Sequence, residues 1–201
     1  MVIMYIHGKG GSADEAEHYK SLCEGFEVAG LDYHGTAPWE TKDEILAEYE
    51  SLRRKFGSVS VIANSIGAYF CMNALHGREI ERAFFISPVV NMERLILGMM
   101  SFAGVSESEL EAKGEVDTSF GEKLSWEYLC YVRNNPLTWT APTWILHGEN
   151  DNLIPAARVR EFAVKHNAEL TVMPGGEHWF HTDEQMKFLD EWLMRCLKAK
   201  E

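Results

Sequence analysis

The sequence lacks paired cysteines and an excess of basic residues, and each absence argues against a class of function. Its four cysteines, Cys23, Cys71, Cys130 and Cys196, are widely separated and form no CxxC pair. The sequence therefore predicts neither a zinc site nor a disulfide framework. Lys and Arg number 19 against 31 Asp and Glu, which gives a formal net charge of −12. Such an acidic chain repels polyanions, so we expect no nucleic-acid partner and interpret the charge as solubilising.

A long uncharged apolar run is also missing. A membrane-spanning helix needs about 20 such residues. The first apolar run, Val2–Ile6, is short, follows no basic residue and ends at glycines, which is unlike a secretory signal peptide. We interpret it as a buried strand, and we expect a cytoplasmic protein without a membrane partner.

Apolar residues are plentiful and occur in two kinds of segment. They make up 46% of the 201 residues, enough for one sizeable core, so we expect a single domain spanning residues 1–201. Short apolar runs predict strands, and the longer amphipathic stretches between them predict helices. The predicted strands are 2–6, 26–31, 58–63, 82–86, 143–146 and 170–173, and the predicted helices are 41–56, 66–76, 156–166 and 183–198.

Strands that alternate with helices indicate a mostly parallel sheet with helices on both faces. The stretch 89–141 departs from this alternation. It contains a Met- and Leu-rich piece (92–102), an acidic piece (106–122) and an aromatic piece (126–131). We interpret it as a small helical insertion over one end of the sheet, either a lid or an ordinary crossover with extra helices.

The first candidate for chemistry is Ser65, in the segment Ala-Asn-Ser-Ile-Gly at positions 63–67. This segment directly follows a predicted strand and directly precedes a predicted helix. A sharp turn there requires small flanking residues and holds the serine above the carboxyl edge of the sheet. The N-terminus of the following helix favours negative charge at the same place. The context is typical of a nucleophile elbow, and the alternative is a serine that only caps the helix.

A glycine-rich turn, His-Gly-Lys-Gly-Gly-Ser at positions 7–12, follows the first predicted strand. It matches no nucleotide-binding fingerprint, because GxGxxG and GK[ST] are both absent. It fits one wall of an oxyanion hole, with the backbone N–H of Lys9 as one donor and that of Ile66, next to the serine, as the second. The alternative is a tight turn that binds nothing.

A carboxylate is available in the loop that follows the predicted strand 143–146. Asp151 lies just beyond the end of that strand, in the segment HGENDNLIP. A carboxylate in this position can accept a hydrogen bond from an imidazole and fix its tautomer. Glu149 is a competing carboxylate, and Asp183 is a more remote one.

An imidazole is available in the loop that follows the last predicted strand. His178 lies there in the segment GGEHWF, with His181 as its rival. A histidine in a glycine-rich loop at the sheet edge can take a proton from the serine and return it to a leaving group. All four loops begin at the carboxyl ends of predicted strands, where open parallel sheets bind their ligands.

The same four segments resemble motifs of the α/β-hydrolase superfamily, and the resemblance spans nearly the whole chain. Positions 7–12 resemble the family's HGxGG oxyanion loop, and positions 63–67 resemble its nucleophile elbow. Positions 148–155 resemble its GxxDxxVP acid loop, and positions 175–180 resemble its Gly-x-x-His-Phe-type histidine loop.

The resemblance implies a role for each candidate residue. It implies Ser65 as the nucleophile, His178 as the base and Asp151 as the residue that orients the base. It implies Lys9 and Ile66 as the oxyanion-hole donors. The resemblance therefore favours Asp151 over the competing carboxylates and His178 over the competing histidine.

The resemblance also implies the architecture, with two departures. The expected fold is an α/β-hydrolase-like three-layer sandwich with a reduced, about six-stranded sheet, because the chain begins at what resembles the family's third strand. The elbow begins with Ala63 where the family usually has glycine. Alanine is still small, so we expect the turn to be kept.

The expected reaction is hydrolysis of a small carboxylic ester or thioester through an acyl-enzyme. Acyl transfer or peptide cleavage on the same triad is an alternative, and so is a catalytically silent binding protein. We expect a small-molecule acyl substrate as the partner and no metal or organic cofactor. Large apolar side chains that could line its binding site are Met99, Phe102, Trp126 and Trp179.

Overall fold

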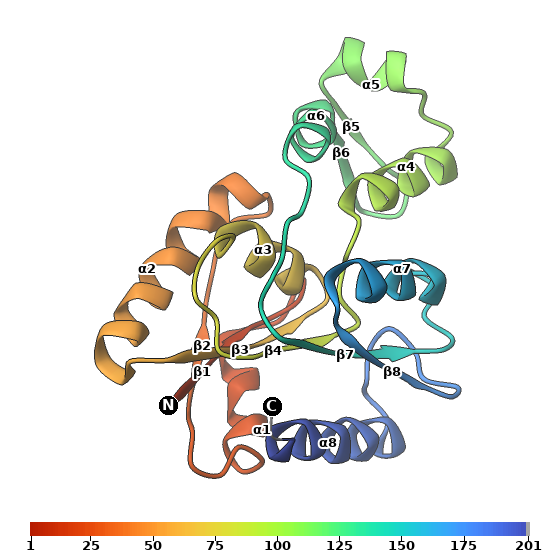
Figure 1. The fold of residues 1–201 in the computed structure, drawn as a ribbon. Helices are drawn as coiled ribbons and strands as arrows, with labels where there is room; N and C mark the ends of the chain where they lie inside the picture. Colours follow the sequence, from red (N-terminus) through yellow and green to blue (C-terminus); the bar gives the residue numbers. More distant parts are fainter. Residues whose placement is uncertain (200–201) are drawn as a thin grey trace. The chain divides into compact units, whose positions relative to one another are not determined.

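Six strands form one sheet in the computed structural model, which describes residues 1–199 (Figure 1). Their order is β2-β1-β3-β4-β7-β8, and every neighbouring pair is parallel. This confirms the expected α/β class and the reduced, six-stranded parallel sheet. The strands are β1 (Val2–Ile6), β2 (Glu27–Leu31), β3 (Val59–Asn64), β4 (Ala83–Ile86), β7 (Thr143–Gly148) and β8 (Glu169–Met173).

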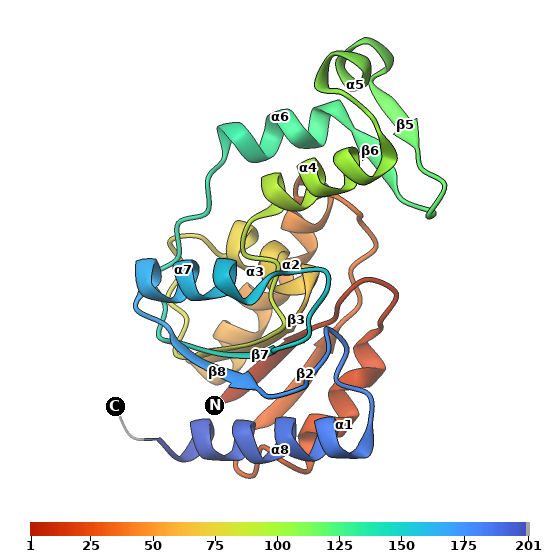
Figure 2. The same cartoon turned by 90° about the vertical axis from the view of Figure 1, so that its right-hand side faces the viewer.

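Helices cover both faces of this sheet (Figures 1 and 2). One face carries α1 (Ala16–Lys20), which follows the short 3₁₀ helix η1 (Ala13–Glu15), and α8 (Asp183–Lys198). The other face carries α2 (Pro38–Phe56), α3 (Ile66–Ala74) and α7 (Ala156–His166). Because both faces are covered, every residue of β1 and β4 is buried. In the described part of the chain, no helix is long and apolar enough to cross a membrane.

The start predicted for the helix over 41–56 is wrong. Helix α2 begins three residues earlier, at Pro38, and Thr41 is a buried residue inside it. Proline suits the first helical position, where its missing N–H is not needed. The Glu40 side chain accepts hydrogen bonds from the backbone N–H groups of Thr36 (2.7 Å) and Ala37 (3.1 Å). These contacts, rather than Thr41, close the N-terminus of the helix.

The strand order reverses at β1, which lies between β2 and β3. The loops that leave β1 and β3 therefore turn toward opposite faces, and doubly wound sheets bind their ligands at such a reversal. Strand β7 extends two residues beyond the predicted end at position 146, so His147 and Gly148 belong to the strand. The loops after β1, β3, β7 and β8 all start at the same edge.

The chain divides into two compact units. Unit 1 consists of Met1–Val90 together with the chain from Thr138 onward, and unit 2 consists of Asn91–Leu137. Unit 2 lies within the stretch 89–141 that the sequence marks as an insertion, and its action as a lid stays a prediction. It contains a two-stranded antiparallel hairpin, which the sequence did not predict. Its elements are α4 (Met92–Ala103), α5 (Glu107–Lys113), β5 (Glu115–Asp117), β6 (Lys123–Ser125) and α6 (Trp126–Asn134).

A single arginine ties the three helices of unit 2 together. Arg133 of α6 donates to Glu93 of α4 (2.8 Å) and forms two parallel hydrogen bonds with Glu107 at the start of α5 (2.7 and 2.8 Å). The paired geometry suits the planar guanidinium. Helix α4 also has a side-chain cap, because Asn91 accepts a hydrogen bond from the Arg94 N–H (3.0 Å).

Candidate active site

Ser65 occupies a strained turn between β3 and α3. Its backbone angles, φ 52° and ψ −119°, lie in a region that residues with side chains seldom adopt and that costs on the order of 1–3 kcal/mol. The turn is held by hydrogen bonds from Ser65 N–H to Ile86 O (2.9 Å) and from Val89 N–H to Ser65 O (3.1 Å). Gly67 makes the turn sterically possible, because a Cβ there would overlap the carbonyl oxygen of His7. The Ser65 side chain makes no capping hydrogen bond to α3, so it does not act as a simple N-cap.

The glycine-rich turn after β1 passes beside Ser65. A Cβ added to Gly8 would lie 3.3 Å from the Cβ of Ser65, so the backbone leading to Lys9 runs against the serine. His7, the first residue of the turn, stabilises it. Its Nδ1–H donates to Gly8 O (2.7 Å), and its ring stacks on Tyr33 (4.2 Å between centroids, 5° between planes). Ile66 is the first residue of α3, so its N–H belongs to the helix N-terminus beside the serine.

The serine, the histidine and the aspartate predicted from sequence lie in one hydrogen-bonded chain. Ser65 Oγ is 2.9 Å from His178 Nε2, and His178 Nδ1 is 2.6 Å from Asp151 Oδ2. His178 and Asp151 are both buried, at 4% and 8% exposure. A carboxylate only accepts, so His178 Nδ1 carries the hydrogen and Nε2 is free to receive the serine proton.

The Asp151 carboxylate is held in its ionised form. Burial raises its pKa, but hydrogen bonds from His178 and from the backbone N–H groups of Ile154 and Leu153 outweigh burial and bring the pKa below its ordinary value. The two backbone groups donate to Oδ1 at 2.8 and 2.9 Å. Oδ2 is therefore left to face the imidazole.

The competing residues from the sequence analysis have other partners. Glu149 accepts a hydrogen bond from Gly175 N–H (3.0 Å) and thus links the acid loop to the histidine loop. Asp183 is the first residue of α8, where a carboxylate favours the helix N-terminus. His181 is exposed, and its Nδ1–H donates to Trp179 O (2.8 Å).

Comparison of the sequence with models of protein families and with curated proteins finds no match. Solved structures do match the fold. A hydrolase of Agrobacterium vitis superposes with a TM-score of 0.77 at 14% identity, covering 98% of this chain and 88% of that one. Est1E of Butyrivibrio proteoclasticus gives a TM-score of 0.74 at 20% identity, with 99% and 88% covered. A monoglyceride lipase of Saccharomyces cerevisiae gives 0.64 at 15% identity, with 100% and 88% covered.

The chain has the α/β-hydrolase fold. This confirms the fold that the resemblance of the four loop motifs implies. The hydrolase fold also accepts the alanine at the first elbow position, because Ala63 is completely buried within β3 and leaves the turn intact.

Two residues that support the site in this hydrolase fold have contacts that the sequence did not reveal. Tyr33 donates its hydroxyl to His7 O (2.9 Å) and packs edge-on against Phe70 of α3. His147, at the end of β7, is completely buried and its Nε2–H donates to Ile154 O (3.0 Å). Both contacts end on backbone carbonyls, whose positions depend on loop conformations that sequence patterns do not specify.

The predicted substrate-binding residues fall into both units. Trp179 is in unit 1, 62% exposed, with its ring perpendicular to that of His178 at 5.5 Å. Met99, Phe102 and Trp126 are in unit 2, where Phe102 is 80% exposed and packs against Phe120 (5.2 Å between centroids). Substrate binding by these four residues stays a prediction.

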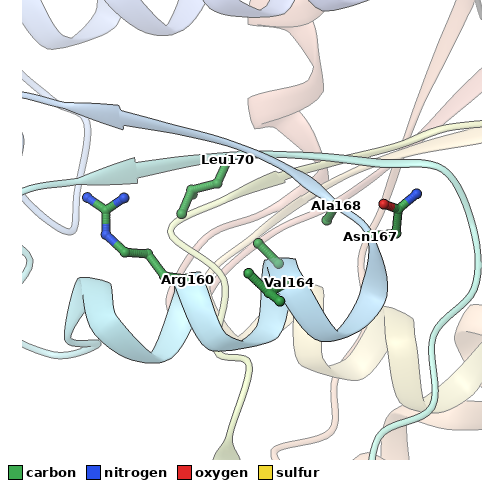
Figure 3. A pocket seen from close by; sticks show the side chains of 6 residues that line it. Arg160, Val164, Asn167, Ala168 and Leu170 are labelled. Carbon is green, nitrogen blue, oxygen red and sulfur yellow. The ribbon is translucent and has the colours of Figure 1, made fainter.

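A hollow elsewhere on the hydrolase fold does not involve the triad. It lies between α7 and the edge strand β8 and is lined by Arg160, Ala163, Val164, Asn167, Ala168 and Leu170 (Figure 3). Val164 is 85% exposed beside it. Within residues 1–199, no group of three or more His, Cys, Asp or Glu side chains is arranged to hold a metal ion.

Proposed function

We propose that this chain is a serine hydrolase that cleaves a small carboxylic ester or thioester through an acyl-enzyme on Ser65. The observation that carries the proposal is the chain of hydrogen bonds from Ser65 Oγ to His178 Nε2 (2.9 Å) and from His178 Nδ1 to Asp151 Oδ2 (2.6 Å). Neighbours of the same fold that are named esterase, from Pyrococcus furiosus, and monoglyceride lipase, from Saccharomyces cerevisiae, support a hydrolytic reaction.

In the first half-reaction, Ser65 Oγ attacks the acyl carbonyl carbon while His178 Nε2 takes the hydroxyl proton. The imidazolium that forms is stabilised by the ionised Asp151. The carbonyl oxygen becomes an oxyanion, for which the N–H groups of Lys9 and Ile66 are the proposed donors. Collapse of the tetrahedral intermediate breaks the bond to the alcohol or thiol, which leaves with the proton from His178.

In the second half-reaction, water replaces the departed alcohol or thiol. His178 takes a proton from this water as its oxygen attacks the acyl carbon of the Ser65 ester. The second tetrahedral intermediate then releases the carboxylic acid, and the proton on His178 returns to Ser65 Oγ. The enzyme is thus restored, with water consumed and one acyl bond cleaved.

A fluorophosphonate probe tests the nucleophile directly, because it modifies only activated serines. We expect wild-type protein and Ser87→Ala to be labelled, and Ser65→Ala not to be labelled. Ser87 is a matched control: it directly follows the neighbouring strand β4 and also has a positive φ, 44°, but it is completely buried and outside the triad. Labelled Ser65→Ala, or unlabelled wild type with native circular dichroism, would contradict the proposal.

The acyl acceptor and acyl length are tested with a panel of p-nitrophenyl esters and matched thioesters. We expect release of free acid to exceed transfer to added alcohols or amines. Predominant transfer would instead make the chain an acyltransferase on the same triad. A labelled protein that turns over no ester, thioester or amide would fit a binding protein that has kept a reactive serine.

A further inference from the structure

A second histidine lies against the triad carboxylate. His147 is completely buried at the end of β7, and its Nδ1 is 3.7 Å from Asp151 Oδ2. Its Nε2 is 3.0 Å from Ile154 O, which can only accept, so Nε2 carries a hydrogen, and in the neutral ring Nδ1 then carries a lone pair. Among the described residues, Nδ1 has no hydrogen-bond partner. A buried ring nitrogen without a partner, aimed at an active-site carboxylate, calls for a physical explanation.

His147 and Asp151 hold the same loop residue from two sides. The N–H of Ile154 donates to Asp151 Oδ1 (2.8 Å), and the carbonyl of Ile154 accepts from His147 Nε2–H (3.0 Å). The loop that positions Asp151 is therefore fixed at Ile154 through both polar groups of its peptide backbone. Loss of either contact would leave the carboxylate freer to turn away from His178.

The neutral form of His147 leaves Asp151 Oδ2 to His178. A lone pair at Nδ1 cannot donate to Oδ2, so the hydrogen bond from His178 (2.6 Å) meets no competitor from this side. Protonation of His147 would place a second N–H group and a positive charge beside the same oxygen. Oδ2 would then be shared, and Asp151 would stabilise the His178 imidazolium less.

We propose that His147 is a positioning residue for Asp151 whose neutral form keeps the triad active and whose protonation at acidic pH turns it off. This proposal deepens the proposed function and rests on it, because Ser65 must first be a nucleophile served by His178. The consequence is that two histidines, rather than one, govern the loss of activity in acid.

The surroundings of His147 keep it neutral near pH 7. Burial lowers its pKa, the negative charge of Asp151 and the hydrogen bond to Ile154 O oppose this, and His178 and Arg160 add to the lowering. Asp151, His178 and Arg160 are the titratable or charged groups that act on the ring. The net direction is a pKa below the ordinary value, so protonation occurs on the acid side of neutrality.

The first test is the pH profile of fluorophosphonate labelling in wild type and His147→Gln. Glutamine keeps an amide N–H that can reach Ile154 O but cannot be protonated. Where two histidines must both be neutral, the wild-type labelling rate should fall about a hundredfold per pH unit at the acid end, against about tenfold in the variant. His166→Gln is the matched control, since His166 also donates to a backbone carbonyl (Trp139 O, 2.8 Å) but lies at the far end of α7. It should keep the wild-type slope.

A second measurement does not depend on activity or on a variant of His147. In ¹⁵N-labelled protein, His147 should show the Nε2–H tautomer, and Asp151→Asn should shift its titration to lower pH, because the charge that favours its protonation is gone. Identical pH slopes in wild type and His147→Gln, or an unchanged His147 titration in Asp151→Asn, would overturn the inference. Failure of wild type to react with the probe would instead overturn the proposed function.

Discussion

Asp151 and Glu149 lie two positions apart in one loop, and side-chain length separates their roles. The short Asp151 side chain reaches the N–H groups two and three residues further on, at 2.9 and 2.8 Å. This local contact is typical of aspartate in turns and fixes the direction of its second oxygen. Glu149 is longer and extends across to Gly175 N–H (3.0 Å). Only Asp151 is therefore oriented toward His178.

Paired substitutions should separate the two carboxylates. Asp151→Asn keeps the shape but offers an amide where His178 needs an acceptor, so we expect kcat/KM for an ester to fall by a factor of about 10³–10⁴. Glu149→Gln should leave kcat/KM close to wild type, because Glu149 contacts only the backbone of the histidine loop. Steady-state kinetics measures both. An equal loss in the two variants would mean that the loop as a whole, rather than the Asp151 charge, supports the reaction.

Helix α3 approaches the end of β1 so closely at Gly67 that no side chain fits there. A Cβ at Gly67 would overlap the carbonyl oxygens of His7 and Ile6, which are backbone atoms of a buried segment and cannot move aside cheaply. We expect Gly67→Ala to lower the free energy of unfolding by at least about 3 kcal/mol or to prevent folding. Urea unfolding followed by circular dichroism measures the change.

Gly98→Ala is the control for that substitution. Gly98 lies inside α4, and apart from its neighbours and the helix's own backbone no described atom lies within 4 Å of an added Cβ. There alanine should stabilise by about 0.5–1 kcal/mol, because glycine is the poorer helix former. A mild effect of Gly67→Ala, similar to that at Gly98, would contradict the close approach of α3 to the backbone at the end of β1.

The sequence predicted the types of the main elements better than their ends. Apolar runs identify buried strands when both sheet faces are covered, which is why all six strands of the parallel sheet were found. The start of α2 was missed because its N-terminus is closed by Glu40 and Pro38 rather than by a Ser or Thr cap. Strands β5 and β6 were missed because each has only three residues, too few for a periodic pattern.

At the scale of the whole molecule, a parallel sheet explains why the site was predictable. Residues from four loops, separated by more than a hundred positions, meet because parallel strands bring their carboxyl ends to one edge. Any motif at such an end is therefore a candidate neighbour of the others. The contact of His147 with Ile154 was not predictable, since Ile154 O is a backbone atom placed by the conformation of a loop.

The stability of the whole molecule should also report the buried histidine. The folded state lowers the pKa of His147 below its ordinary value near 6.5, so between the two values the unfolded chain binds more protons. The neutral His147 ring therefore contributes to the free energy of unfolding in full above about pH 6.5, and this contribution is lost as the pH falls through the folded-state pKa. The ionised Asp151 carboxylate contributes to stability in the same way at lower pH. Its pKa is lowered from 3.8 in the folded state, so its contribution is present above about pH 3.8 and is lost as the pH falls through the folded-state pKa.

Urea unfolding between about pH 7.5 and pH 4.5 separates the two groups. We expect the free energy of unfolding of wild type to fall faster over this range than that of His147→Gln, since glutamine takes up no proton in either state. Both proteins keep Asp151, so the loss of stability that comes from its lowered pKa should be common to both. Parallel curves over the whole range would mean that His147 takes up its proton as readily in the folded protein as in the unfolded chain, despite its complete burial.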